Sequence, residues 1–332
     1  MKDRAMATEP GPFVAAIVQA SPVAGDLVPD PDASLEKLGD LVSDAAREHQ
    51  ARVVNVGETW LPGYPAWIDH CPGAMLWDNP EVKEVFAAYR RASVAVGDER
   101  FRRLSEVART NEVVLIAGVS ERVNEGAGQG SLYNTLFTFD ADGRMVNHHR
   151  KLVPTFTERV IWGYGDGAGL RSSETVVGRV SSLVCWEHWM PLARQVLHVS
   201  GEILHAAVWP TVHERHQIAS RQYAFEGRCF VLASGQIQRA DQHLPRTLDR
   251  QADREPDELV LRGGSAIIAP DASYLAGPVF DEEAIIAAEI DPLMVDRESM
   301  TLDVTGHYSR PDVFAFGVKP DAASRETTWS PE

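Results

Sequence analysis

Three segments of the sequence place a reactive polar residue at the end of an apolar run. RVVNVGE ends at Glu58, VNHHRK ends at Lys151 and SSLVC ends at Cys185. Runs of this kind predict buried strands, and in α/β proteins the loops after such strands are where catalytic side chains gather. We therefore expect the glutamate, the lysine and the cysteine to meet in one site.

These three residue types suit covalent catalysis by a thiol. Cys185 is the expected nucleophile, and it needs a base or a positive neighbour to supply a thiolate at neutral pH. Glu58 is the expected base, which takes the thiol proton and later activates water, and burial should raise its pKa. Lys151 is expected to stabilise negative charge on the substrate. The backbone N–H of Trp186, next after the nucleophile, is a second donor for that charge.

The segments around these residues resemble the nitrilase branch of the carbon–nitrogen hydrolase superfamily. The resemblance rests on GETWLPGYP, HRKLVPTFTERVIWGYGDG and VCWEHWMPLAR, and on the later segments GGSAIIAPDASYLAGP and DVTGHYSRPDVF. It covers about residues 13–318, with its segments in the same order. One departure is the NVG before Glu58, where family members frequently carry a Phe-Pro pair.

The resemblance implies a nitrilase that converts an organic nitrile to a carboxylic acid and ammonia, with no metal or organic cofactor. It also implies a four-layer α-β-β-α sandwich that forms a homodimer or a larger homo-oligomer. Glu58, Lys151 and Cys185 keep the roles given above. Glu158, in PTFTER, matches a second family glutamate that holds the lysine and assists proton handling. Attack by Cys185 gives a thioimidate, then a thioester, which water activated by Glu58 hydrolyses.

Segments with strand-like and helix-like patterns alternate around these residues. Apolar runs predict strands over residues 13–20, 52–58, 113–121, 131–140, 144–151, 180–187, 202–210 and 228–235. Helical spacing predicts helices over 32–49, over 80–110 with a break near Gly97, between Pro191 and Gly201, and over 214–226. The charged segment 239–258 reads as a surface loop, and three short strands follow it in GSAIIAP, SYLAGPV and AIIAAEID.

This order predicts an α/β fold with about ten strands and four or five helices. Some strands alternate with helices and others follow one another directly, so both sheets should be mixed. No linker divides the chain. We expect a single domain over residues 13–318, with two stacked sheets covered by helices, and terminal tails over 1–12 and 319–332.

Aromatic residues are concentrated near the proposed catalytic residues, and they are candidates for the substrate pocket. For any one tryptophan, packing in the core and forming an aromatic wall for an apolar nitrile are equally good explanations. Tyr64 is the best candidate, because it follows Glu58 closely across a Pro-Gly turn. The candidate pocket residues are Trp60, Tyr64, His188, Trp189 and Trp209.

The sequence HERH, with His213 and His216, is the main competing pattern. Its spacing differs from the HExxH zinc signature, and only His205 or Glu214 offers a third ligand, so we interpret it as an ordinary helix surface. GYGDGA lacks the preceding βαβ strand of a dinucleotide site, and no GxSxG elbow is present. The alternatives are an amidase or cyanide-degrading member of the family, a metal-dependent hydrolase, and a catalytically silent assembly protein.

The composition indicates which classes of partner and which cellular compartment to expect. The 332 residues include 32 Lys and Arg against 48 Asp and Glu, and this net charge of −16 repels nucleic-acid phosphates. No run of about 18 apolar residues predicts a membrane helix, and the N-terminal segment lacks the apolar core of a secretory signal. Three cysteines are too few for a disulfide scaffold and predict a cytoplasmic protein, with Cys71 and Cys229 as packing residues.

Overall fold

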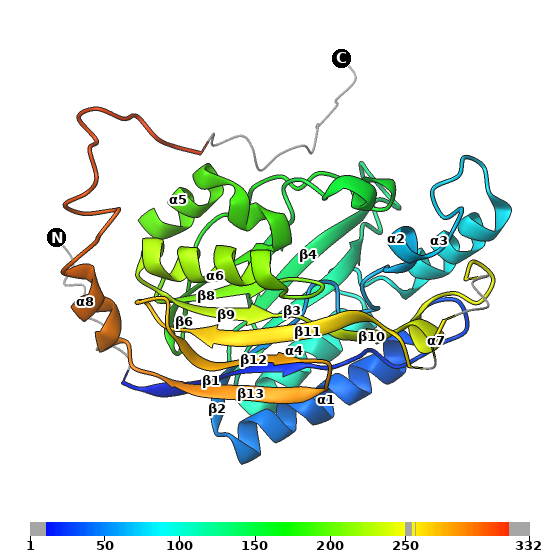
Figure 1. Ribbon diagram of the computed structural model, residues 1–332, viewed down its shortest axis with the longest axis horizontal. Helices are drawn as coiled ribbons and strands as arrows, with labels where there is room; N and C mark the ends of the chain where they lie inside the picture. The colour runs from blue at the N-terminus through cyan, green and yellow to red at the C-terminus, as the bar shows by residue number, and fades with distance from the viewer. Residues whose placement is uncertain (1–10, 250–253, 256, 319–332) are drawn as a thin grey trace.

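The computed structural model describes residues 11–249, 254–255 and 257–318. Two mixed sheets stack against each other at its centre (Figure 1). The first has the order β13 (Ala284–Ile290), β1 (Phe13–Gln19), β2 (Ala51–Val56), β3 (Val114–Arg122), β4 (Leu132–Phe139) and β5 (Met145–Arg150). The second has the order β10 (Ile237–Arg239), β11 (Leu259–Ile268), β9 (Phe230–Ser234), β8 (Leu204–Val208), β7 (Gly178–Val184) and β6 (Ser173–Thr175), with β12 (Tyr274–Phe280) also paired to β11.

Strand direction brings several strand ends to one edge of each sheet. Strands β1, β2 and β3 are parallel, and β5 runs with them because β4 is antiparallel to both β3 and β5. In the second sheet β7, β8 and β9 are parallel. Parallel neighbours need a crossover. The connecting helices are α1 (Pro31–Glu48), α2 (Trp67–His70), α3 (Pro80–Ala92), α4 (Glu99–Asn111), α5 (Pro191–Val199) and α6 (Glu214–Gly227).

The packing confirms the expected order of four layers. Leu38 of α1 and Leu104 of α4 are buried against the outer face of the first sheet. Leu197 of α5 and Tyr223 of α6 belong to the core cluster of the second sheet, and that cluster also contains first-sheet residues such as Ile17. The layers therefore run helices, sheet, sheet, helices, and most apolar burial lies between them.

Local signals explain where these helices begin. Asp30 caps α1 by accepting hydrogen bonds from the backbone N–H groups of residues 32 and 33, and Asn79 and Asp98 cap α3 and α4 in the same way. Gly97 has a positive φ of 81° between α3 and α4. The break expected near that glycine is confirmed, because a side chain would disfavour this backbone conformation.

The segment 239–258 differs from its expected form as a surface loop. It begins at the end of β10 and includes α7 (Ala240–His243). Ala240, Leu244 and Leu248 are buried beside Tyr64 and Trp67, so these apolar residues anchor a segment whose charges dominate its composition. Residues 250–253 and 256 lie outside the described part of the chain.

The counts of elements also exceed the expectation. The described residues form thirteen strands and eight α-helices, because very short elements such as β6, β10 and α8 (Leu293–Ser299) carry too little pattern to recognise. No helix within the described ranges has the length and apolarity needed to cross a membrane. Residues 1–10 and 319–332 lie outside these ranges, so the tail boundaries remain predictions.

Candidate active site

The edge where the parallel strands end brings the proposed catalytic residues together. Glu58 follows β2, Lys151 follows β5 and Cys185 follows β7, while Glu158 lies in the short 3-10 helix η1 (Phe156–Val160). All four side chains are buried, with at most 3% of any residue exposed. Acceptor atoms of Glu58 and Glu158 and the Sγ of Cys185 lie within 4.8 Å of one another.

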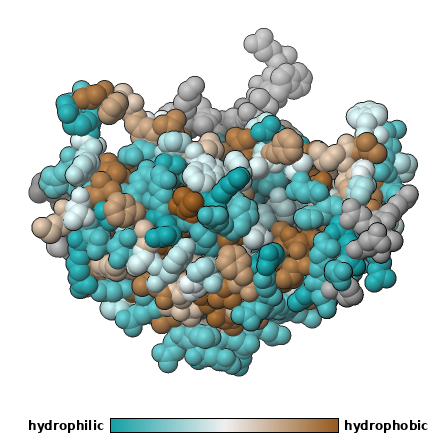
Figure 2. Space-filling model, viewed as in Figure 1, coloured by the Kyte–Doolittle hydropathy of each residue, from teal (hydrophilic) through white to brown (hydrophobic). Residues whose placement is uncertain are grey.

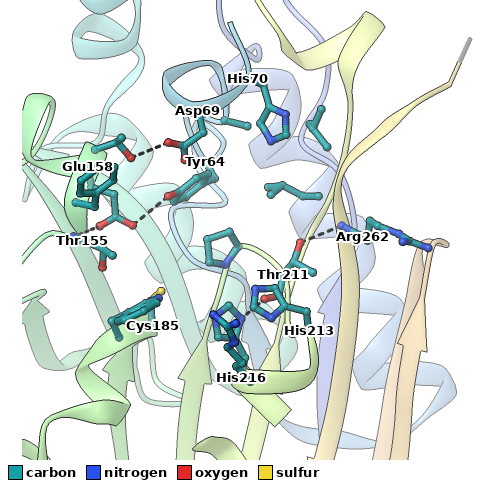
Figure 3. A pocket seen from close by; sticks show the side chains of 18 residues that line it. Tyr64, Asp69, His70, Thr155, Glu158, Cys185, Thr211, His213, His216 and Arg262 are labelled. Carbon is teal, nitrogen blue, oxygen red and sulfur yellow. Dashed lines mark hydrogen bonds between the residues drawn. The ribbon is translucent and has the colours of Figure 1, made fainter. Parts of the chain in front are cut away.

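The ammonium group of Lys151 joins the two carboxylates. Its Nζ donates to Glu58 Oε1 at 2.9 Å and to Glu158 Oε2 at 2.7 Å. Asn134 Nδ2 donates to Glu58 Oε1 at 2.6 Å, and the Tyr64 hydroxyl donates to Glu158 Oε1 at 3.0 Å (Figure 3). Each carboxylate is therefore fixed by the lysine and by a neutral donor.

Burial sets the protonation of this group. It raises the pKa of Glu58 to about 7 against the opposing charge of Lys151. Burial also raises the pKa of the Cys185 thiol well above its usual value, and the Glu58 carboxylate adds to that rise. Burial by itself lowers the pKa of Lys151, but the negative charges of Cys185, once it is ionised, and of the two carboxylates outweigh burial and raise that pKa well above its usual value. The resting site therefore holds a neutral thiol, a charged lysine and a base that titrates near neutrality.

The backbone at Cys185 aims the thiol into the site. Val184 is extended and ends β7, Cys185 has a left-handed φ of 54°, and the 3-10 helix η2 (Cys185–Trp189) begins there. Such a turn costs conformational energy for a residue with a side chain, and it is found where a functional group must be presented. The backbone N–H of Trp186 interacts with the thiol sulfur and favours its ionised form.

Glu187 is a positioning residue that the sequence reasoning missed. Its Oε2 accepts hydrogen bonds from the Val184 backbone N–H at 2.7 Å and from His149 Nε2 at 2.8 Å, and its Oε1 accepts from the Leu152 N–H at 2.8 Å. This buried carboxylate thus joins the segment after β5 to the segment after β7. Its place as the third residue of Cys-Trp-Glu was the available signal.

A cavity of about 530 Å³ opens beside the thiol, a volume within the range of small-molecule sites. Cys185 and Glu158 lie on one side of it, and His213 and His216 lie across from them (Figure 3). Tyr64 and Trp186, both predicted near the substrate, line the cavity. The other lining residues are Ala66, Asp69, His70, Thr155, Phe156, Thr157, Pro210, Thr211, Arg215, Val260, Leu261 and Arg262.

The structure places the other four candidate pocket residues elsewhere. Trp60 is fully buried in the core of the first sheet, where its Nε1 donates to the Ala20 carbonyl at 2.8 Å. Trp209 and His188 are also buried and stack on each other at 4.8 Å, and neither is among the lining residues. Trp189 is 39% exposed and is not among the lining residues. The four residues do not line this cavity because nearness in sequence to a catalytic residue does not determine the direction in which a ring points.

Of the two histidines in HERH, one differs from the expectation that both lie on a helix surface. His213 is exposed, as expected for a helix surface, but His216 is buried, stacks on Trp209 at 4.2 Å and lines the cavity. The rings of His213 and His216 stack at 3.8 Å, so they lie face to face and do not converge on one point.

Potential metal ligands among the described residues converge only at Glu58, Glu158 and Cys185. The Nζ of Lys151 bonds to both carboxylates of that group. The lysine therefore already provides the positive charge that a metal ion would supply to these two ligands.

We expect alkylation of Cys185 by iodoacetamide to follow the ionisation of Glu58. Below pH 7 Glu58 is protonated and cannot accept the thiol proton, so the rate should rise with pH to a plateau with a midpoint near 7. Peptide-resolved mass spectrometry measures the rate at each cysteine. Glu58→Gln should abolish the step near pH 7. Cys71 is the internal control, because its pKa of about 12 should keep it slow throughout. A Cys185 rate that is independent of pH between 5 and 9 would contradict this assignment.

Known proteins are similar to this chain in sequence and in fold. Residues 14–297 match the carbon–nitrogen hydrolase family. An aliphatic nitrilase from Sinorhizobium fredii is 37% identical over 324 residues, which cover 95% of this chain and 98% of that protein. An arylacetonitrilase from Trametes versicolor is 36% identical over 93% of this chain and 98% of its own length. The crystal structure of a carbon–nitrogen hydrolase from Helicobacter pylori shares the fold, with a TM-score of 0.68 at 19% identity, over 91% of this chain and 96% of that one. The chain therefore belongs to the carbon–nitrogen hydrolase family, in its nitrilase branch.

Proposed function

We propose that this protein is a nitrilase that hydrolyses an organic nitrile to a carboxylic acid and ammonia. The observation that carries the proposal is the buried ammonium of Lys151, bonded to both Glu58 and Glu158 within reach of the Cys185 sulfur. This arrangement provides a nucleophile, a base with a pKa near 7 and a fixed positive charge in one water-poor site. The similarity to named nitrilases over most of the chain supports a nitrile as the substrate class.

The reaction follows from the charges in the site. Glu58 takes the thiol proton as the Cys185 sulfur attacks the nitrile carbon, and the negative charge that develops on nitrogen faces Lys151 and the N–H of Trp186. Protonation of that nitrogen gives a thioimidate. One water adds, ammonia leaves and a thioester remains. A second water, deprotonated by Glu58, releases the acid and restores the thiol. If the thiol leaves before ammonia does, an amide is released instead.

The cavity supports an organic nitrile over cyanide. Its volume of about 530 Å³ greatly exceeds what a two-atom substrate needs. Tyr64, Phe156, Trp186, Val260 and Leu261 offer apolar surface along its walls. An apolar substituent would be sheltered from water there, and this burial would contribute to binding.

The protein should release ammonia from a panel of neutral nitriles. Alkylation of its thiols, or Cys185→Ala, should reduce the rate at least about a thousandfold, because the covalent route is lost. Cys71→Ala is the matched control and should leave the rate within about twofold of wild type. The measurement is ammonia and product analysis with nitriles and the corresponding amides.

Each alternative predicts a different outcome on that panel. Loss of activity with a strong chelator, combined with indifference to alkylation, would favour a metal-dependent hydrolase. Turnover of amides alone would indicate an amidase, and turnover of cyanide alone would indicate a cyanide-degrading enzyme. No turnover of any substrate would favour a catalytically silent assembly protein.

We further propose that the chain forms a homodimer or a larger homo-oligomer, in a reducing cytoplasm where Cys185 stays a free thiol. Apolar residues remain exposed on the outer helices, namely Leu192 and Val199 on α5 and Ile218 and Phe225 on α6. Figure 2 shows apolar residues among polar ones on the face that these helices occupy in Figure 1. The segment after α8 also extends away from the sandwich with exposed aromatic residues, including Tyr308 and Phe314 (Figure 1). A second copy would cover such surfaces.

Sedimentation velocity tests this assembly. The wild-type protein should sediment as a species of at least twice the monomer mass. Ile218→Asp should shift the distribution towards the monomer, because it places a charge in an apolar contact. Leu275→Asp, on β12, is the matched control and should leave the distribution unchanged. A wild-type protein that sediments as a monomer at micromolar concentration would contradict the proposal.

A further inference from the structure

A chain of buried polar side chains runs behind Cys185, away from the cavity. It consists of Glu202, Ser181, His205 and His188, each at most 4% exposed. Ser181 and His205 are direct neighbours on the parallel strands β7 and β8. None of the four residues lines the cavity, and the proposed reaction uses none of them.

The hydrogen bonds of this chain connect without a gap. The Ser181 hydroxyl bonds to Glu202 Oε2 and lies 2.6 Å from His205 Nδ1. His205 Nε2 lies 3.0 Å from His188 Nε2, and His188 Nδ1 lies 2.7 Å from the backbone carbonyl oxygen of Cys185. A carboxylate at one end is thus joined to the nucleophile's own carbonyl at the other.

Counting protons along this chain fixes its charge. The Cys185 carbonyl can only accept, so His188 Nδ1 must carry a proton, and a neutral His188 then has a lone pair on Nε2. The contact of 3.0 Å with His205 Nε2 needs a proton between the two nitrogens, because two lone pairs would repel each other there. A neutral His188 therefore requires His205 to be protonated at Nε2.

The proton on His205 Nε2 permits two arrangements with the same charge. In one, His205 is protonated on both nitrogens and faces an ionised Glu202. In the other, the protonated Glu202 carboxyl donates a hydrogen bond to the Ser181 oxygen, and the Ser181 hydroxyl donates a hydrogen bond to His205 Nδ1. Burial lowers the pKa of His205, and this favours the second arrangement. The histidines beside Glu202 lower the pKa of Glu202 to about 2 against the effect of burial, and this favours the first arrangement. Either way the chain is electrically neutral, as deep burial demands.

The far end of the chain acts on the peptide group between Cys185 and Trp186. The carbonyl oxygen and the N–H of a trans peptide point in opposite directions from one rigid plane. A hydrogen bond from His188 to the carbonyl therefore holds the N–H of Trp186 towards the thiol, where it interacts with sulfur. Hydrogen bonding to a carbonyl also polarises the peptide and makes its N–H a stronger donor.

We propose that Glu202, Ser181, His205 and His188 share one proton and, through it, position and polarise the Cys185–Trp186 peptide. The catalytic consequence rests on the proposed function: the four residues strengthen the Trp186 N–H, the donor that stabilises negative charge on the substrate nitrogen. His188 and His205 are positioning residues, because neither touches the substrate. Their effect should appear in kcat and not in KM, since charge on the nitrogen develops only during reaction.

A kinetic comparison of three variants tests the catalytic consequence. His205→Leu cannot donate to His188 and should lower kcat about 10- to 100-fold, with KM within about twofold of wild type. His205→Gln carries an N–H that can reach His188 Nε2, so it should recover most of that loss. His198→Leu is the matched control. His198 is also a buried histidine bonded to Glu202, at 2.8 Å, but among the described residues no hydrogen bond or ring contact is found between it and His188. Equal kcat values for His205→Leu and His205→Gln would overturn the polarising role.

A measurement on the wild-type protein tests the shared proton without any activity. In protein labelled with ¹⁵N-histidine, we expect a downfield imidazole proton coupled to the Nε2 atoms of both His188 and His205. It should disappear in His205→Leu and persist in His198→Leu. Spectra in which both Nε2 atoms are unprotonated would overturn the proton count, even if the enzyme hydrolyses nitriles. If the coupled proton is present and no nitrile is turned over, the proton count stands and the proposed function fails.

Discussion

A buried ammonium group between two buried carboxylates is the constraint on which the site depends. Removing a lysine charge from water costs several kcal/mol, and only close partners of opposite charge can offset that cost. Lys151 has two such partners, Glu58 and Glu158. Two carboxylates against one cation leave an excess negative charge in an apolar setting, so one proton binds unusually tightly. Burial and that excess bring the pKa of Glu58 to about 7. The interaction that stabilises the charge of Lys151 thus also sets the pKa at which Glu58 can act as a base.

The sandwich holds these charges in place because they follow strands that end at one edge. Glu58 and Lys151 extend from the first sheet and Cys185 extends from the second, so any sliding of one sheet over the other would separate them. Glu187 opposes such sliding, since its carboxylate binds the backbone after β5 and the backbone at the end of β7. The Gln236 side chain donates to the Glu58 carbonyl at 2.6 Å and ties the end of β2 to the segment after β9. The geometry of catalysis is therefore a property of how the two sheets are stacked.

Much of this arrangement could be predicted because it rests on local patterns. An apolar run followed by one polar residue identifies a strand end, and three such ends gave Glu58, Lys151 and Cys185. The four layers followed from helical and strand periodicities together with a resemblance over most of the chain. Side-chain direction could not be obtained in this way. Trp60 and Tyr64 both follow Glu58 closely, yet Trp60 is buried in the core and Tyr64 bonds to Glu158.

Contacts between segments that lie far apart in the sequence also could not be predicted. His188 was expected to line the pocket, but the pairing of β7 with β8 brings His205 to its other side and makes it part of a buried chain. His216 was interpreted as part of a helix surface because HERH does not match a zinc signature, but its side chain is buried and its ring stacks on Trp209. In each case a partner from another strand or helix determines the role.

Single-turnover trapping tests the central claim, that the thiol held beside this charge cluster forms the covalent bond. The enzyme would be mixed with less than one equivalent of a nitrile, quenched in acid during the first turnover, digested and examined by mass spectrometry. We predict an added acyl mass on the peptide that contains Cys185. Ammonia release with the added mass on Cys71 or Cys229, or with no added mass on any cysteine, would contradict the account.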